Sequence, residues 1–309
     1  MTPPDDDKKS AGLNIDIGVG AKASYEISKK IIQEVPEDVT RTKAKAFLDA
    51  ISPFTQASGL LGDWIEDKRE RLRFHRLQTL TEIANKAQKQ IEEQAKQPNP
   101  VPVKALIPML ERASLEESDD EALTTAWAAL IASASLEYDA EVTTFSRILS
   151  ELSPRECLIL QRVFGGRWDW VSGTRPPGAM TRFFESEAEI KPMLRQAVVK
   201  EDKSVFSKLQ NYVDPAFPME FTRALTRGTS QRANWIDKVL KEPFYAENEL
   251  GYPLLETQGL IIGRGQGYSW DVGETPVGVD WVELTDLGSR FVARVIPRTH
   301  KQKAKAPES

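Results

Sequence analysis

The chain has 309 residues, which is long for one compact core and favours two domains with tails. Its hydrophobic content of 40% and charged content of 28% are ordinary for a soluble globular protein, and its formal net charge of -5 argues against nucleic-acid binding by the molecule as a whole. A single cysteine, Cys157, excludes an internal disulfide, so we expect a buried structural thiol and a cytoplasmic location.

Residues 1–20 predict a flexible N-terminal arm. The start, MTPPDDDKKS, is polar and lacks the apolar stretch of a secretion signal. Further along, Leu13 to Val19 alternates apolar and polar residues, a pattern of an edge strand or of an arm that orders on a partner. No apolar run of about 18 residues follows, so a membrane-spanning helix is not expected.

Three helices are predicted before residue 100, over residues 21–35, 40–51 and 59–97. Pro36 ends the first, and Ser52-Pro53 ends the second. The third would be over 50 Å long at about 1.5 Å per residue, more than a small helical domain accommodates. We therefore expect its second half, Leu80 to Ile91, to fold back on residues 21–51 or to pair with a second copy.

A basic cluster lies on the predicted long helix. Its sharper interpretation is contact with phosphate or anionic lipid, and its plainer one is a solvated face with salt bridges to the interleaved acidic residues. The residues proposed for an anionic contact are Lys68, Arg69, Arg73 and Arg76.

The most regular stretch runs from Ser114 to Cys157. Ser118 and Glu121 have capping-box spacing, and behind them Trp127 sits within an apolar stripe that predicts a helix. A second helix is expected from Val142 to Leu152, with Trp127 buried between the two. Ser153-Pro154-Arg155-Glu156 then predicts the start of a third. A short helix over residues 102–112 precedes all three.

This stretch resembles the abortive infection alpha (Abi-alpha) family. The resemblance rests on the acidic start, the helical core WAALIASA, and the phrase ILSELSPRECLIL, and it is best over residues 59–164 and looser over 254–295. It implies a protein associated with abortive infection, the defence of a bacterial population against phage. The shared motifs are structural, so they imply a fold more directly than an activity.

Residues 165–252 resemble the family weakly and are interpreted as an insertion. A Gly-, Pro- and aromatic-rich loop opens it, and helices are predicted over 187–199 and 204–212. The apolar run from Ser230 to Leu240 predicts one more helix.

The end of the chain predicts a helix, a β-hairpin and a final helix. Gly259 would end a helix and lead into a strand, and Gly263 to Gly267 (GRGQG) reads as a flexible turn. Period-two patterns then predict strands near 268–272 and 277–282, and Thr285 would cap the last helix. This order resembles winged-helix domains whose first helix starts at Ser153. The basic tail, residues 298–309, is expected to be disordered.

These patterns predict a mainly α protein: a helical domain over residues 21–152, then an α+β winged-helix-like domain over 153–297 with a small β-hairpin. No catalytic, cofactor or metal motif is found, and the only histidines are His75 and His300, so we expect neither an enzyme nor a small-molecule substrate.

Three functions remain open. The first is an Abi-alpha-like defence component acting through a protein partner or self-association. The second is a winged-helix DNA-binding regulator that uses Arg264, Arg290 and Arg294, although net charge disfavours it. The third is a membrane-associated effector, for which the short N-terminal arm is weak support.

Overall fold

The computed structural model describes residues 37–54, 74–165, 178–215, 217–227, 236–268 and 275–297. The helical elements are α2 (Glu37–Ile51), the 3-10 turn η1 (Ser52–Phe54), α4 (Phe74–Glu93), α5 (Val103–Ala113), α6 (Glu121–Leu136), α7 (Glu141–Glu151), α8 (Pro154–Phe164), α9 (Thr181–Glu185), α10 (Glu187–Lys200), α11 (Val205–Gln210), α12 (Pro243–Asn248), α13 (Gly251–Thr257) and α14 (Asp286–Val295). The strands are β1 (Met219–Arg227), β2 (Ile236–Lys241), β3 (Ile261–Tyr268) and β4 (Val277–Leu284). The protein is therefore mainly helical, with one antiparallel sheet, as predicted.

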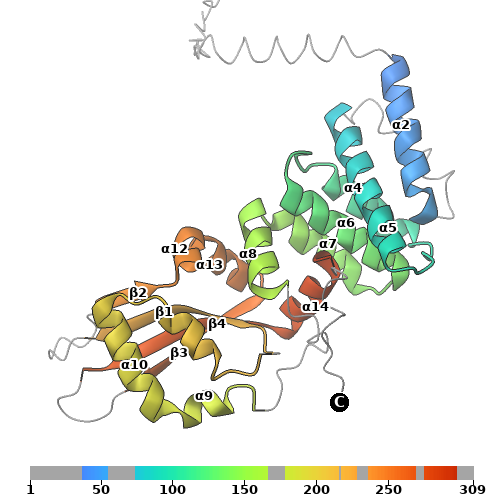
Figure 1. Cartoon of the computed structure of the whole chain (residues 1–309). Coiled ribbons are helices and arrows are strands. Elements are labelled where there is room, and N and C mark those ends of the chain that lie inside the picture. The colour runs from blue at the N-terminus through green and yellow to red at the C-terminus, as the bar shows by residue number, and fades with distance from the viewer. Residues whose placement is uncertain are drawn as a thin grey trace, which may run out of the picture.

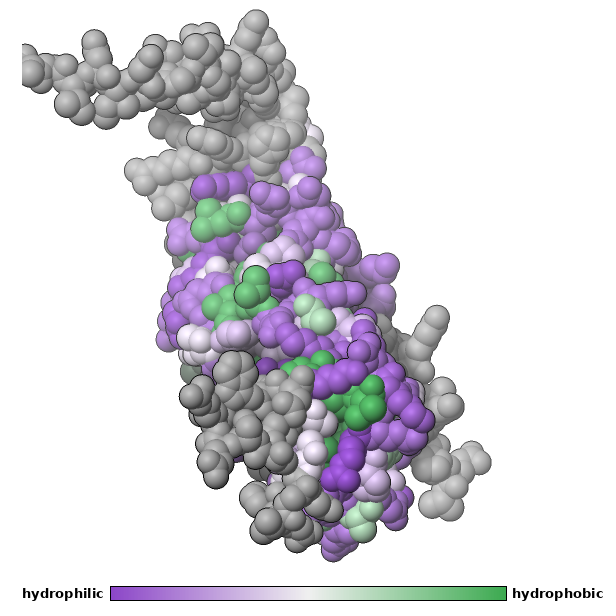
Figure 2. Space-filling model, turned by 90° about the vertical axis from the view of Figure 1, so that its left-hand side faces the viewer, coloured by the Kyte–Doolittle hydropathy of each residue, from purple (hydrophilic) through white to green (hydrophobic). Residues whose placement is uncertain are grey.

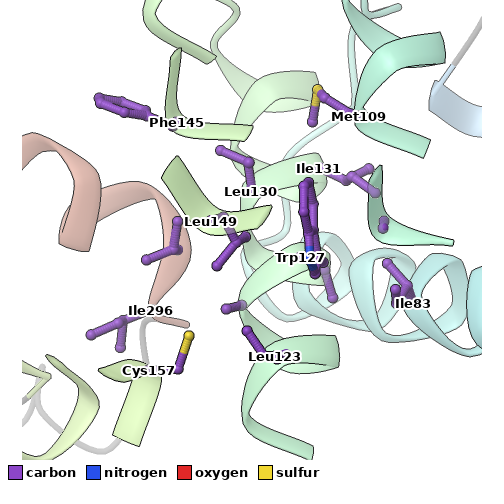
Figure 3. Close-up of a cluster of buried hydrophobic side chains, with 14 of the residues drawn as sticks. Ile83, Met109, Leu123, Trp127, Leu130, Ile131, Phe145, Leu149, Cys157 and Ile296 are labelled. Carbon is purple, nitrogen blue, oxygen red and sulfur yellow. The ribbon is translucent and has the colours of Figure 1, made fainter. Parts of the chain in front are cut away.

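Helix α6 lies at the centre of the helical part of the molecule (Figure 1). Its alanine-rich sequence is apolar nearly all round, which is typical of a helix enclosed by other elements. It contacts α4, α5, α7, α8 and α14. The predicted burial of Trp127 is confirmed, since it is fully buried within the apolar cluster of Figure 3, whereas its predicted position between α6 and α7 stays a prediction. Its indole N–H donates to Glu116 Oε1 at 3.0 Å.

The helix starts around α6 are only partly as predicted. The N-cap of α6 is Asp120, whose carboxylate accepts from the Leu123 N–H at 3.1 Å, so the predicted capping box at Ser118 is wrong. Asp120 is closer to the first apolar turn and supplies the same type of acceptor. The capping box of α8 is confirmed: Pro154 is at its first position, and Glu156 accepts from the Ser153 N–H at 2.8 Å.

Helix α4 contains the second half of the predicted long helix and folds back as expected. It packs against α2 on one side and against α6 on another. The side chains of Leu80, Ile83, Ala87 and Ile91 are buried within the chain. Residues 59–73 lie outside the described residues, as does the helix predicted over residues 21–35.

The sheet has the strand order β2-β1-β4-β3, and every neighbouring pair is antiparallel. The predicted strand near 277–282 is confirmed as β4, but its hairpin partner is β3 at Ile261–Tyr268 rather than a strand over 268–272, of which residues 269–272 lie outside the described ranges. Strands β1 and β2, from the segment interpreted as an insertion, extend the hairpin to four strands. The run from Ser230 to Leu240 was predicted as a helix, and the described part of it is β2. The GRGQG stretch is not a turn but the middle of β3, paired with residues 278–282 of β4.

The buried residues form two clusters. The larger joins α2 and α4–α7 to α8, α13 and α14, so the final helix of the described chain packs against helices from its first half. Thr285 caps α14 by accepting from the Gly288 N–H at 2.9 Å, as predicted. The smaller cluster packs α9–α11 on one face of the sheet, around the ring of Phe183. None of the helices in these described ranges is long and apolar enough to cross a bilayer.

Candidate functional site

The predicted anion-contact residues are mostly outside the described ranges. Lys68, Arg69 and Arg73 all lie outside these ranges, so the anionic contact proposed for them stays a prediction. Arg76, in the first turn of α4, is half-buried.

Arg290 and Arg294 line a polar cleft of about 450 Å³ between the end of α4, the end of α6 and α14. Arg294 donates to the Glu137 carbonyl at 2.8 Å and pairs with the Asp139 carboxylate, and Arg290 lies 3.4 Å from Glu141. We call Arg290 and Arg294 together the α14 clasp. The guanidinium groups of both residues face acidic residues at the α6–α7 junction. The clasp therefore holds the last helix to the centre of the fold.

Arg264 does not join the α14 clasp. It lies on β3 beside a separate hollow of about 270 Å³, which residues of β1, β3, β4, α12 and α13 line. Its Nε is 3.9 Å from the buried carboxylate of Glu283. The three arginines proposed for DNA contact thus belong to two hollows rather than one surface.

The hollow near Arg264 contains an ion pair that sequence reasoning missed. Arg223 on β1 lies 2.9 Å from Asp280 on β4, and its guanidinium is 5.8 Å from the ring centre of Tyr245. Tyr252 is buried beside them, and burial raises the pKa of its phenol. Arg223 and Asp280 are adjacent only because β1 pairs with β4 across more than fifty residues, so no local pattern could indicate the pair.

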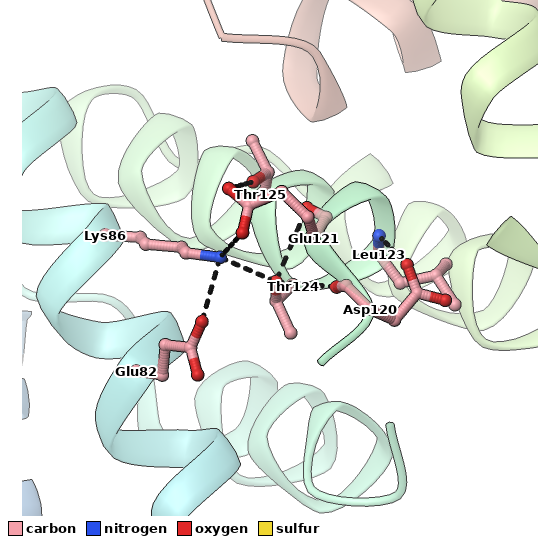
Figure 4. A network of polar contacts seen from close by, with 7 residues as sticks. All are labelled: Glu82, Lys86, Asp120, Glu121, Leu123, Thr124 and Thr125. Atoms are coloured by element: carbon pink, nitrogen blue, oxygen red, sulfur yellow. Dashed lines mark hydrogen bonds and ion pairs between the residues drawn. The ribbon is translucent and has the colours of Figure 1, made fainter. Parts of the chain in front are cut away.

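A second polar group connects α4 and α6 (Figure 4). Lys86 lies 3.0 Å from Glu82 and 3.0 Å from Glu121, and it donates to the Thr124 hydroxyl at 2.8 Å. Partial burial lowers the pKa of Lys86, but the bonds to Glu121 and Glu82 outweigh it and raise the pKa overall. The same bond lowers the pKa of the Glu121 carboxyl. Each of these charges has a partner, which is typical of a structural contact.

Other chemical groups have structural explanations. Cys157 is buried, as predicted, and burial raises the pKa of its thiol, which favours the unreactive protonated form. The acidic residues at the start of α6 also have a structural role, because Asp120 is the N-cap of the helix. In the described ranges, no group of three or more His, Cys, Asp or Glu side chains is placed to hold a metal ion.

The geometry thus defines a mainly helical protein with a packed centre, a clasped final helix and two polar hollows. The family described as "Abortive infection alpha" matches residues 75–217, a little under half of the chain. The match covers α4–α11 except its first residue, and it extends into residues 165–217, which sequence analysis assigned to an insertion. It does not reach residues 254–295, where the looser resemblance was noted. No curated protein and no solved structure matches the chain.

Proposed function

We propose that this protein is a component of bacterial defence against phage by abortive infection, and that it acts through contacts with proteins. The observation that carries the proposal is the family match over residues 75–217. That segment includes the whole of α6 and most of the helices packed around it. The part of the chain that resembles the family is therefore the centre of the fold rather than an appendage.

Two features of the surface support action through contacts. The arginines that line the cleft beside α14 already face carboxylates, so neutralising a phosphate backbone there would require breaking ion pairs. In Figure 2 the described residues of one face are mainly hydrophilic, with separate small apolar patches. Such a surface suits reversible recognition of a partner better than permanent burial.

Phage plating tests the proposed role. Cells that carry the gene are expected to give fewer plaques, or smaller ones, than cells with an empty vector. A strain with Trp127→Ala, which destabilises the fold, should protect less than the wild type. Equal plating with wild-type gene and empty vector, across a phage panel and with confirmed expression, would refute the role in defence.

The contact with proteins is tested on exposed apolar residues. Leu250, before α13, is 79% exposed, and Leu115, after α5, is 63% exposed. We therefore expect that neither Leu250→Ser nor Leu115→Ser disturbs the fold. We expect one of the two variants to lose protection while it keeps its melting temperature, and to recover less of the partner from infected cells. Full protection by both variants would argue that contact uses neither region.

DNA binding is the alternative with its own test. Its signature is a mobility shift with duplex DNA that weakens steeply with salt and is lost in Arg264→Ala. We expect no shift at low salt, because the proposed arginines are divided between two hollows and face acidic partners. A salt-dependent shift that Arg264→Ala abolishes would favour the regulator instead.

A further inference from the structure

Strand β3 is an edge of the sheet. Two hydrogen bonds show which of its backbone groups point away from β4. The Gly263 N–H donates to Glu256 Oε1 of α13 at 3.1 Å, so this N–H points away from β4. The Thr285 N–H donates to the Leu260 carbonyl at 3.0 Å, which gives residue 260 the opposite direction, towards β4. Because direction alternates along a strand, the backbone groups of residues 263, 265 and 267 all point outward.

These three outward residues are all glycine, and all three are exposed. Glycine in the interior of a strand weakens the strand. A glycine there often marks a place where another backbone approaches closely. At Gly265 the fold itself explains the glycine, because a Cβ atom there would lie 2.6 Å from Asp280 Oδ1. At Gly267 a Cβ would meet no described atom within 4 Å, so no described neighbour demands glycine there.

The opposite edge of the sheet differs. Strand β2 carries Lys238 and Lys241, both in ion pairs with nearby glutamates, and its pairing with β1 shifts register near Thr226. Lysines and irregular pairing are the usual protection of an edge strand against other strands. Strand β3 has eight residues with neither lysine nor proline, and its pairing with β4 is regular. Among the described residues, side chains bond to the outer side of β3 at two points: Glu256 accepts from the Gly263 N–H, and Gln266 of β3 itself donates to the Gly267 carbonyl at 3.3 Å, which keeps a second lone pair.

We propose that β3 pairs antiparallel with β3 of a second copy of this chain, forming one continuous eight-stranded sheet. The two-fold axis passes Gln266, so that Gly265 of each copy exchanges backbone hydrogen bonds with Gly267 of the other. In this register Gly263 keeps its bond to Glu256. This contact stands apart from the proposed role in phage defence and does not depend on it.

A second copy is the occupant because the strand is complementary to itself in this register. Arg264 lies opposite the Tyr268 position of the other copy, and Gln266 lies opposite its own counterpart. No like charges therefore face each other across the pair, which would otherwise oppose association. The glycines leave the opposite face free of side chains, so the two backbones approach closely.

The first test compares two changes at Gly267. Gly267→Pro removes the outward N–H without breaking a bond to β4, whereas Gly267→Ala keeps the N–H and adds only a Cβ in open space. Light scattering after size exclusion should give a dimer for the wild type and for Gly267→Ala, and a monomer for Gly267→Pro with an unchanged melting temperature. A wild type that stays monomeric at high micromolar concentration overturns the proposal.

A second test examines the register and does not depend on how well proline is tolerated. Gln266→Glu and Gln266→Lys each place like charges at the two-fold axis, so each should dimerise about fivefold more weakly than wild type. An equal mixture of the two variants should regain the affinity in heterodimers, because the opposed charges then attract. No difference between the mixture and the separate variants would overturn this pairing.

Hydrogen exchange separates a second copy from other occupants of the edge. The amides of Gly265 and Gly267 should become more protected as protein concentration rises. Protection that is already present in the monomer and independent of concentration would show that the chain covers its own edge, which contradicts the proposal.

Discussion

At the scale of single residues, Trp127 is the largest completely buried side chain among the described residues. Trp127→Ala removes the ring and leaves a cavity, so we expect a loss of about 3–5 kcal/mol in the free energy of unfolding. Trp127→Phe is the matched control, because it keeps an aromatic ring and loses the indole N–H. Denaturant titration should place its loss below that of Ala. A thermal melt of Trp127→Ala within error of wild type would reject the packed core.

The partner of that indole predicts a dependence on pH. Burial raises the pKa of the Glu116 carboxyl, and the hydrogen bond from Trp127 offsets this only in part. The folded state therefore holds the proton more tightly than the unfolded state, and stability falls as pH rises from the ordinary glutamate pKa through the raised folded one.

Glu116→Gln removes this titration and keeps an oxygen that can accept from Trp127. At pH 7 the variant should be at least as stable as wild type. Any advantage should shrink as pH falls from the raised folded pKa to the ordinary pKa of glutamate, because wild-type Glu116 becomes protonated in both states. A gap between the two proteins that widens towards low pH would contradict this assignment, and denaturant midpoints at several pH values provide the measurement.

At the scale of elements, the start of α6 tests the cap that the structure shows, Asp120, against the one predicted from the sequence, Ser118. Asp120 bonds to the Leu123 N–H, so Asp120→Ala should cost about 1 kcal/mol. Ser118 lies outside the helix, and Ser118→Ala should change stability by less than about 0.5 kcal/mol. Urea denaturation of both variants checks the order. A larger loss at Ser118 would restore the capping box predicted from sequence.

Helices were easier to predict than strands for physical reasons visible in particular residues. Ser153, Pro154 and Glu156 signal a helix start through bonds within four residues, so the sequence suffices. In β1 the register shifts between Phe221 and Arg223, which interrupts the alternation that marks a strand.

The glycines of β3 also led to a wrong prediction. A local cluster of glycines predicts a turn, whereas the conformation of residues 263–267 is decided by their pairing with β4. The same limit applies to the candidate sites. The arginines near α14 were identified as charged positions on a helix, but their acidic partners are about 150 residues away in the chain. Sequence patterns indicated which residues are basic and not that the fold neutralises them.

At the scale of the whole molecule, the α14 clasp joins the end of the described chain to its centre. The side chain of Arg294 is 19% exposed and binds the end of α6 and Asp139, so Arg294→Ala should cost about 1.5–3 kcal/mol. The control is Arg147→Ala, which loses an exposed pair with Glu151 and should cost less than about 0.5 kcal/mol. Equal losses in thermal melts would mean that the clasp contributes no more than a surface pair.

The position of α14 also has a consequence for synthesis on the ribosome. Helices α4–α8 leave the exit tunnel early, but the helix that covers one side of α6 is made about 155 residues after its contacts at Asp139. Throughout that interval the alanine-rich side of α6 that α14 covers, and the ring of Phe145 that packs on Phe291, lack their cover. Nascent chains of this length expose apolar surface that chaperones recognise. The helical centre thus becomes complete only when α14 has been translated.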